Sequence, residues 1–396
     1  MELTQIRNIA IKHETDWKID QVFINNENLS DVIKGRTFIE WNFEPFRPDN
    51  AKITLQAGFE RLFQDIFCVV DDLYSLDRGC LAAYLSSFLY ERLTPMWTHL
   101  MGCGKHIMAI QYWKKFISIT HEWEDRNKKH IHKGTPYAFI AYTYLLIGDV
   151  DTGFSYIYNA IEEDIKLNSV CPQLNYPRSA PVYLTASLSP DRRNVLYPLV
   201  KEIRSELETY LNDYRKYFGR TLTLSEFDNK FLQDVALDTI KYYFVFTYWT
   251  IFEYRRKVST TMMQNDFSKL KNANWMFALC LVIDKLLNSK YSTKFISDGI
   301  KRLSEDKGFM TETDLNNLRS QDNFNEEPDV VIPKLLPMNL HYNGSSVRKE
   351  IQYLFVAWNI RNFAGHNIQT QNVIVSNFEE LLKILLYGIF IIVEDY

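Results

Sequence analysis

The sequence has little glycine and proline, an odd number of cysteines and no long apolar run. Only 14 glycines and 12 prolines occur in 396 residues, which disfavours a turn-rich β fold and favours an all-α protein. The five cysteines include no C-x-x-C pair, so they predict reduced thiols rather than a disulfide framework. No stretch reaches roughly 18 consecutive apolar residues. We therefore expect a cytoplasmic protein that does not enter a membrane.

Several catalytic and binding motifs are missing as well. There is no Gly-rich phosphate loop, Walker lysine motif or G-x-G-x-x-G, which makes a nucleotide-binding module the weakest functional hypothesis. Cys103 and His106 lack the two further ligands that a zinc site needs. No metal and no cofactor are therefore expected. The net charge of -4 excludes bulk attraction to nucleic acid, so contact with RNA would need a local basic site.

The N-terminal part shows apolar residues at helical spacing from about residue 57 onward. The stretch "PYAFIAYTYLLIGDVDTGFSYIYNAIEEDIKL" predicts two helices about a turn at Gly148. With small Ala141 and Ala160 it resembles a tetratricopeptide-type hairpin, although no second copy follows at that period. We interpret residues 1–170 as irregular α-hairpins that bind a regulatory protein or ligand.

The remainder of the chain predicts a connection and a helical bundle. The stretch "NSVCPQLNYPRSAPVYLTASLSPD" carries four of the twelve prolines, so residues 171–224 are expected to form a connection followed by a helix. An aromatic-rich helix then opens at a Ser225 cap, and three more apolar helices follow. A polar insertion at about 303–345 separates the second from the third. Residues 225–396 therefore predict an up-down four-helix bundle with one long excursion.

One Arg-His pair has a distinctive context. The loose pattern R-x(4–6)-H occurs four times, and about one accidental match is expected, so the pattern alone decides nothing. One match spans a proline, one lies at the poorly patterned N-terminus, and the charge run "EWEDRNKKHIHKGTP" around Arg126 and His132 is typical of a solvated helix end. Only Arg361 and His366 end a long apolar helix, "IQYLFVAWNI".

This segment, "IRNFAGHN", resembles the R-N-x-x-[AG]-H signature of HEPN domains. These are small α-helical bundles of many RNA-cleaving toxins and of CRISPR-associated and other antiviral nucleases. In that family the motif ends the third helix and an apolar fourth helix follows, which "NFEELLKILLYGIFIIV" would supply. The resemblance covers about residues 225–396. It implies an endoribonuclease that needs no metal, cuts RNA as a toxin or antiviral effector, and pairs motif to motif in a homodimer.

The residue types suit RNA cleavage, because RNA carries its own nucleophile in the 2′-hydroxyl. His366 is expected to act as general acid or base near neutral pH. Arg361 stays cationic and can bind phosphate oxygens in the transition state. Residues five apart on a straight helix point about 140° apart. We expect Gly365 to let the backbone leave the helix, so that both side chains face one cleft.

Supporting roles are expected for further residues. Asn362 would orient the motif or bond to the partner chain. Asp284 is either the group that holds an arginine or histidine in place or a structural partner inside the bundle. Lys271, Lys285 and Lys290 would line an RNA path or, alternatively, form a solvated helix face. A hypothesis from another class is an inactive helical adaptor, which dimerises through the bundle and binds protein with the N-terminal hairpins.

Overall fold

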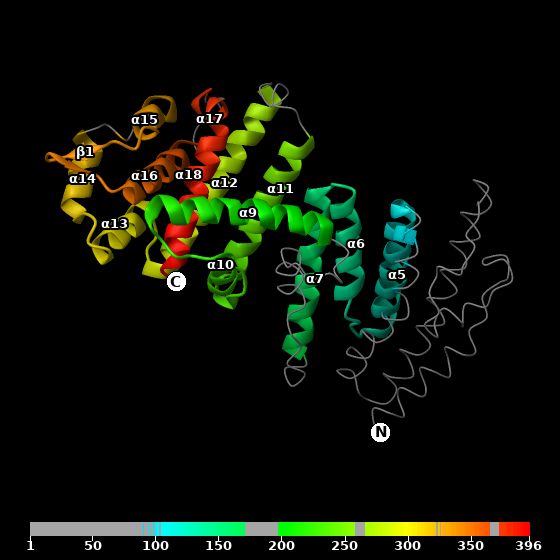
Figure 1. The fold of residues 1–396 in the computed structure, drawn as a ribbon. Coiled ribbons are helices and arrows are strands. Elements are labelled where there is room, and N and C mark those ends of the chain that lie inside the picture. The colour runs from blue at the N-terminus through cyan, green and yellow to red at the C-terminus, as the bar shows by residue number, and fades with distance from the viewer. Residues whose placement is uncertain are drawn as a thin grey trace. The chain divides into compact units, whose positions relative to one another are not determined.

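The computed structural model is almost entirely helical, as the composition predicted (Figure 1). It describes residues 104–170, 197–257, 266–321, 326–364 and 372–396, together with 100–102, Tyr90, Thr94, Trp97 and Phe324. The chain divides into two compact units, Met1–Tyr183 and Leu184–Tyr396, which are treated separately below. None of the described helices combines the length and apolarity needed to cross a membrane.

Within unit 1 the described helices pack as successive neighbours. They are α5 (His106–Asn127), α6 (Gly134–Leu146) and α7 (Val150–Val170). Helices α6 and α7 form the expected hairpin, and Gly148 adopts φ +79° in the turn between them, a conformation that favours glycine. Ala141 and Ala160 are both buried in this hairpin.

Unit 2 contains most of the described helices and one short β-hairpin. Its elements are α9 (Tyr197–Phe218), α10 (Leu224–Phe227), the π-helix η4 (Asp228–Leu232), the 3-10 helix η5 (Val235–Leu237), α11 (Asp238–Lys257), α12 (Asp266–Tyr291), α13 (Ile296–Asp306), α14 (Glu312–Gln321), α15 (Pro328–Leu335), β1 (His341–Tyr342), β2 (Ser345–Ser346), α16 (Lys349–Ala364), α17 (Asn372–Ser376) and α18 (Phe378–Glu394).

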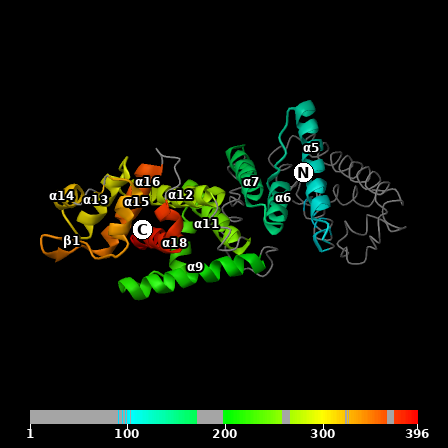
Figure 2. The same cartoon turned by 90° about the horizontal axis from the view of Figure 1, so that it is seen from above.

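Helices α12, α16 and α18 pack against one another in the centre of unit 2 (Figure 1). Helix α11 flanks α12, and α9 packs across α18, as Figures 1 and 2 show from two sides. Thirteen of the 17 residues of α18 are buried, as expected for so apolar a helix. Because α9 packs on α18, unit 2 includes a helix that the sequence placed in the connection before residue 225.

The helix expected from Ser225 onward is instead divided into α10, η4, η5 and α11. Its cap is Thr223, whose Oγ1 accepts from the Glu226 N–H at 3.2 Å, while Glu226 Oε2 accepts from the Thr223 N–H at 2.7 Å. This reciprocal capping box satisfies two N–H groups that a cap at Ser225 would leave open. Further along, Asp234 Oδ1 accepts from the Ala236 N–H at 2.9 Å, a local bond that competes with continuous helix.

The expected insertion at 303–345 is folded onto the bundle. It comprises the end of α13, then α14, α15 and the β1–β2 hairpin, which gather on the side of unit 2 away from α11 (Figures 1 and 2). Leu318, Ile332 and Leu335 are fully buried. The hairpin turn is Asn343-Gly344, both with positive φ, a pair that favours two-residue hairpins. The insertion is therefore a folded part of unit 2 that packs against α16.

Helices α12 and α18 approach closely at Gly388, which gives a test of the packing. A Cβ at this position would lie 3.0 Å from Ile283 Cδ1. We expect Gly388→Val to lower the free energy of unfolding by about 1–3 kcal/mol, because the added methyl groups force the two helices apart. Chemical denaturation measures this loss. The loss should shrink in an Ile283→Val background, which removes the opposing methyl group; an equal loss in both backgrounds would contradict the contact.

Candidate functional site

Arg361 lies in the last turn of α16 and forms an ion pair with Asp284 of α12. The distance from Arg361 Nε to Asp284 Oδ2 is 3.2 Å. Asp284 is buried, with 5% of its side chain exposed, whereas the Arg361 side chain is 36% exposed. The structure thus brings together two residues, 77 positions apart, that the sequence proposed for one site. This contact fits both roles considered for Asp284, because an ion pair that holds the arginine also joins α12 to α16.

A second contact fixes the carboxylate of Asp284 from its other oxygen. Asn288, one helical turn further along α12, donates from Nδ2 to Asp284 Oδ1 at 2.9 Å. Thr293 in turn donates from Oγ1 to Asn288 Oδ1 at 2.9 Å. Both oxygens of the buried acid are therefore used. Asn288 was not among the predicted site residues, although an acid and an amide four residues apart on a helix can form a hydrogen bond.

The ion pair leaves the outer end of Arg361 available. Among the described residues no other group accepts a hydrogen bond from Arg361, and only its Nε is engaged. A guanidinium carries five N–H donors, so the four on the two terminal nitrogens have no described protein acceptor. Such an arrangement fits a phosphate group, which an arginine binds through two parallel hydrogen bonds.

His366 and Gly365 lie outside the described residues, so the expected approach of the imidazole to Arg361 stays a prediction. The described chain resumes at α17, where Asp329 Oδ1 of α15 accepts from the Val373 N–H at 3.0 Å. Asn362 is half-buried, and within the described part of the chain its side chain makes no hydrogen bond. Its expected role in orienting the motif therefore has no contact to support it here.

The three lysines do not share one face of α12. Lys271 and Lys290 lie about 28 Å apart along the helix axis, and Lys290 points about 140° away from Lys285. Lys285 is exposed, and Lys271 lies 5.5 Å from the ring centre of Tyr254. Lys290 donates from Nζ to the Asp395 carbonyl at 2.6 Å, and burial lowers its pKa. The geometry does not favour a single RNA path along these residues.

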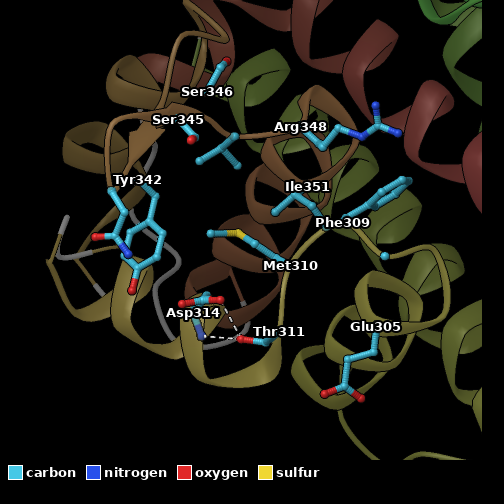
Figure 3. A pocket seen from close by; sticks show the side chains of 13 residues that line it. Glu305, Phe309, Met310, Thr311, Asp314, Tyr342, Ser345, Ser346, Arg348 and Ile351 are labelled. Atoms are coloured by element: carbon cyan, nitrogen blue, oxygen red, sulfur yellow. Dashed lines mark hydrogen bonds between the residues drawn. The ribbon is translucent and has the colours of Figure 1, made fainter.

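A separate cavity of about 530 Å³ lies between the turn after α13 and the β-hairpin (Figure 3). Met310 and Ile351 lie between Tyr342 on one side and Phe309 and Arg348 on the other. Ile351 is ten residues before Arg361 on α16, which places the cavity about 15 Å away along the helix axis. The folded insertion creates this cavity, and it is distinct from the Arg361 site.

Unit 1 contains a cluster of charged side chains where the sequence predicted a solvated helix end. His132 and Lys133 are buried, and His132 Nε2 lies 2.7 Å from Asp164 Oδ1. Lys133 Nζ lies 2.6 Å from Glu124 Oε1 and 3.5 Å from Glu163 Oε2. The prediction of a solvated helix end was wrong for His132 and Lys133. Acidic side chains on α7, about thirty positions later in the chain, offset the cost of burying these two residues.

His130 bridges the same two glutamates at the edge of this cluster. Its Nδ1 lies 3.0 Å from Glu124 Oε1 and its Nε2 lies 3.0 Å from Glu163 Oε2. Burial lowers the pKa of His130, but the hydrogen bonds to both glutamates outweigh burial and the net pKa is raised. Burial raises the pKa of Glu163, whereas the bond from His130 and the charge of Lys133 bring it down to about 2.

Metal-binding groups are not gathered anywhere in the described residues: no set of three or more His, Cys, Asp or Glu side chains could hold an ion there. Cys280, one turn before Asp284 on α12, is a free, fully buried thiol whose pKa is raised by burial. Cys103 lies outside the described residues. Comparison with models of protein families, with curated protein sequences and with solved structures finds no match for this chain.

The ion pair predicts a coupling between its two residues. Arg361→Gln leaves the buried Asp284 without its cation, and Asp284→Asn leaves the arginine without its anion. We expect the free energy of unfolding of the double variant to exceed the additive expectation by about 1 kcal/mol or more. Denaturant unfolding of the four proteins measures this. Lys285→Gln, an exposed neighbour, serves as control and should change stability by less than about 0.5 kcal/mol; strict additivity of the pair would contradict the contact.

The His130 bridge predicts a pH dependence for unit 1. Because the pKa of His130 is raised on folding, its contribution is complete below its unfolded pKa of about 6.5 and is lost as pH rises through the folded value. The lowered pKa of Glu163 gives a contribution that is lost as pH falls from about 4.5 toward 2. Amide hydrogen exchange in α5 and α7 across this range reports both. In His130→Gln the loss above neutral pH should disappear; an unchanged profile would contradict the bridge.

Proposed function

We propose that unit 2 is a metal-independent endoribonuclease of the HEPN type, acting as a toxin or antiviral effector. The observation that supports this most is the Arg361 ion pair: a buried acid holds Nε while the terminal nitrogens have no described acceptor. If the only role of Arg361 were to pair with Asp284, further acceptors at its terminal nitrogens would make the pair more stable. A held guanidinium with open donors is instead suited to an incoming anion.

In the proposed reaction the 2′-oxygen of the RNA attacks the adjacent phosphorus. His366 takes the proton of the 2′-hydroxyl as the O2′–P bond forms, and the bond from phosphorus to the 5′-oxygen breaks. His366 of a second copy gives a proton to the departing 5′-oxygen, so that two motifs form one composite site in a homodimer. The products are a 2′,3′-cyclic phosphate and a 5′-hydroxyl end.

Arg361 would stabilise the negative charge that accumulates on the non-bridging phosphate oxygens. The contribution of Asp284 and Asn288 is to restrict the guanidinium to one orientation before the substrate arrives, which avoids an entropic cost during the reaction. The hairpins of unit 1 would bind the regulatory protein or ligand that controls cutting.

The first test is cleavage of mixed cellular RNA in EDTA by the purified full chain. We expect wild-type protein to produce cyclic-phosphate ends without metal. His366→Ala should slow single-turnover cleavage by about 100-fold or more, because it removes the general acid and base. Arg361→Lys keeps the charge but loses the paired donors, and it should also be strongly impaired. His341→Ala, an exposed histidine on β1, is the matched control and should retain full activity.

Two results would contradict the proposal. Equal cleavage by wild type and His366→Ala would show that the activity belongs to another site or to a contaminant. A wild-type protein that cuts no RNA and is as harmless in cells as His366→Ala would favour the helical adaptor.

A further inference from the structure

Arg319 of α14 lies over the indole of Trp358 on α16. The distance from Arg319 Cζ to the ring centre is 3.8 Å, which is a close cation–π contact. Trp358 is only 6% exposed, so the guanidinium covers part of this ring from solvent. No described group accepts a hydrogen bond from the N–H donors of this guanidinium, which number five.

Arg319 has no carboxylate partner among the described residues, unlike most arginines of unit 2. Arg204 pairs with Asp228, Arg220 with Glu350, and Arg255 with Glu206 and Glu379. Among the described residues Arg319 has no such acid, although it is half-buried and burial lowers its pKa. A partly dehydrated cation without a counterion provides an attractive position for an anion.

The position of Arg319 is fixed by contacts on the insertion. The Phe324 N–H donates to the Arg319 carbonyl at 3.1 Å, and Phe324 packs on Phe355 of α16 with ring centres 5.5 Å apart. Asn359 is buried and donates from Nδ2 to the Glu326 carbonyl at 3.0 Å. The end of α14 is therefore held against the part of α16 that carries Trp358.

This place adjoins the candidate site. Trp358 and Arg361 are three residues apart on α16, and residues at this spacing are neighbours on a helix surface. Arg361 also has terminal donors without a described acceptor. Arg319 thus contacts a residue that neighbours Arg361 on α16, and both guanidinium groups have N–H donors with no described acceptor.

We propose that Arg319 binds a second phosphate of the RNA strand, adjacent to the phosphate that Arg361 binds. The inference rests on the proposed nuclease function and adds a substrate requirement to it. A strand with two neighbouring phosphates engages both arginines, whereas a dinucleotide with one phosphate engages Arg361 alone. Arg319 is a substrate-binding residue in this scheme and takes no part in proton transfer.

The test is calorimetric binding of 2′-O-methyl oligonucleotides, which lack the nucleophile and stay intact. Arg319→Gln should weaken the trinucleotide about tenfold or more, the loss expected for one charge-assisted hydrogen bond. It should leave the dinucleotide unchanged. The slope of log affinity against log salt for the trinucleotide should fall by about 0.7, as expected for one lost phosphate contact on a single strand. Arg319→Met keeps an apolar side chain over Trp358, and we expect it to weaken the trinucleotide as much as Arg319→Gln does. A loss seen only in Arg319→Gln would instead indicate a folding defect from the uncovered ring.

The matched control is Arg348→Gln. Arg348 also lies over an aromatic ring, 4.7 Å from the centre of Phe309. It precedes Arg361 by thirteen residues, which places it about 20 Å away along α16, and the trinucleotide should bind as in wild type. If Arg319→Gln and wild type bind the trinucleotide with equal affinity and equal salt slope while cleavage persists, the second phosphate site is overturned. If wild type neither binds the oligonucleotides nor cuts RNA, the nuclease function itself fails.

Discussion

The contact between Arg361 and the buried Asp284 is the constraint on which the candidate site depends. A carboxylate with 5% of its side chain exposed needs a cation and hydrogen bonds, and Arg361 and Asn288 supply them. The same contact joins the last turn of α16 to α12, so it also holds these two helices together. The same ion pair therefore stabilises the packing of α12 and α16 and holds a partly exposed cation at the end of α16.

The insertion between α13 and α16 takes part in the same arrangement. Its helix α15 packs on α16, its Glu326 carbonyl accepts from Asn359 of α16, and its Asp329 accepts from the Val373 N–H at the start of α17. An insertion that packs near Arg361 can add contacts to a substrate without changing the central helices α12, α16 and α18.

Periodicity and composition predicted the helices well, because apolar faces such as that of α18 determine both helix and burial. Two local patterns in the sequence could have predicted further features. The T-x-x-E pattern of Thr223 and Glu226 indicates the capping box, and Asn343-Gly344 indicates the hairpin turn. Other features have no local signal. The burial of His132 depends on Asp164, and the cover on Trp358 depends on Arg319, so both arise only when distant elements meet. The HEPN resemblance and the role of His366 stay predictions.

A crystal structure of the His366→Ala chain with a bound 2′-O-methyl dinucleotide would show directly whether Arg361 binds the phosphate. We expect the phosphate about 2.7–3.2 Å from the terminal nitrogens of Arg361, with Nε still on Asp284. A phosphate bound elsewhere, or an Arg361 that has to leave Asp284 to reach it, would contradict the proposed site. In either case the ion pair would be a structural contact and the site would have to be sought in another part of the chain.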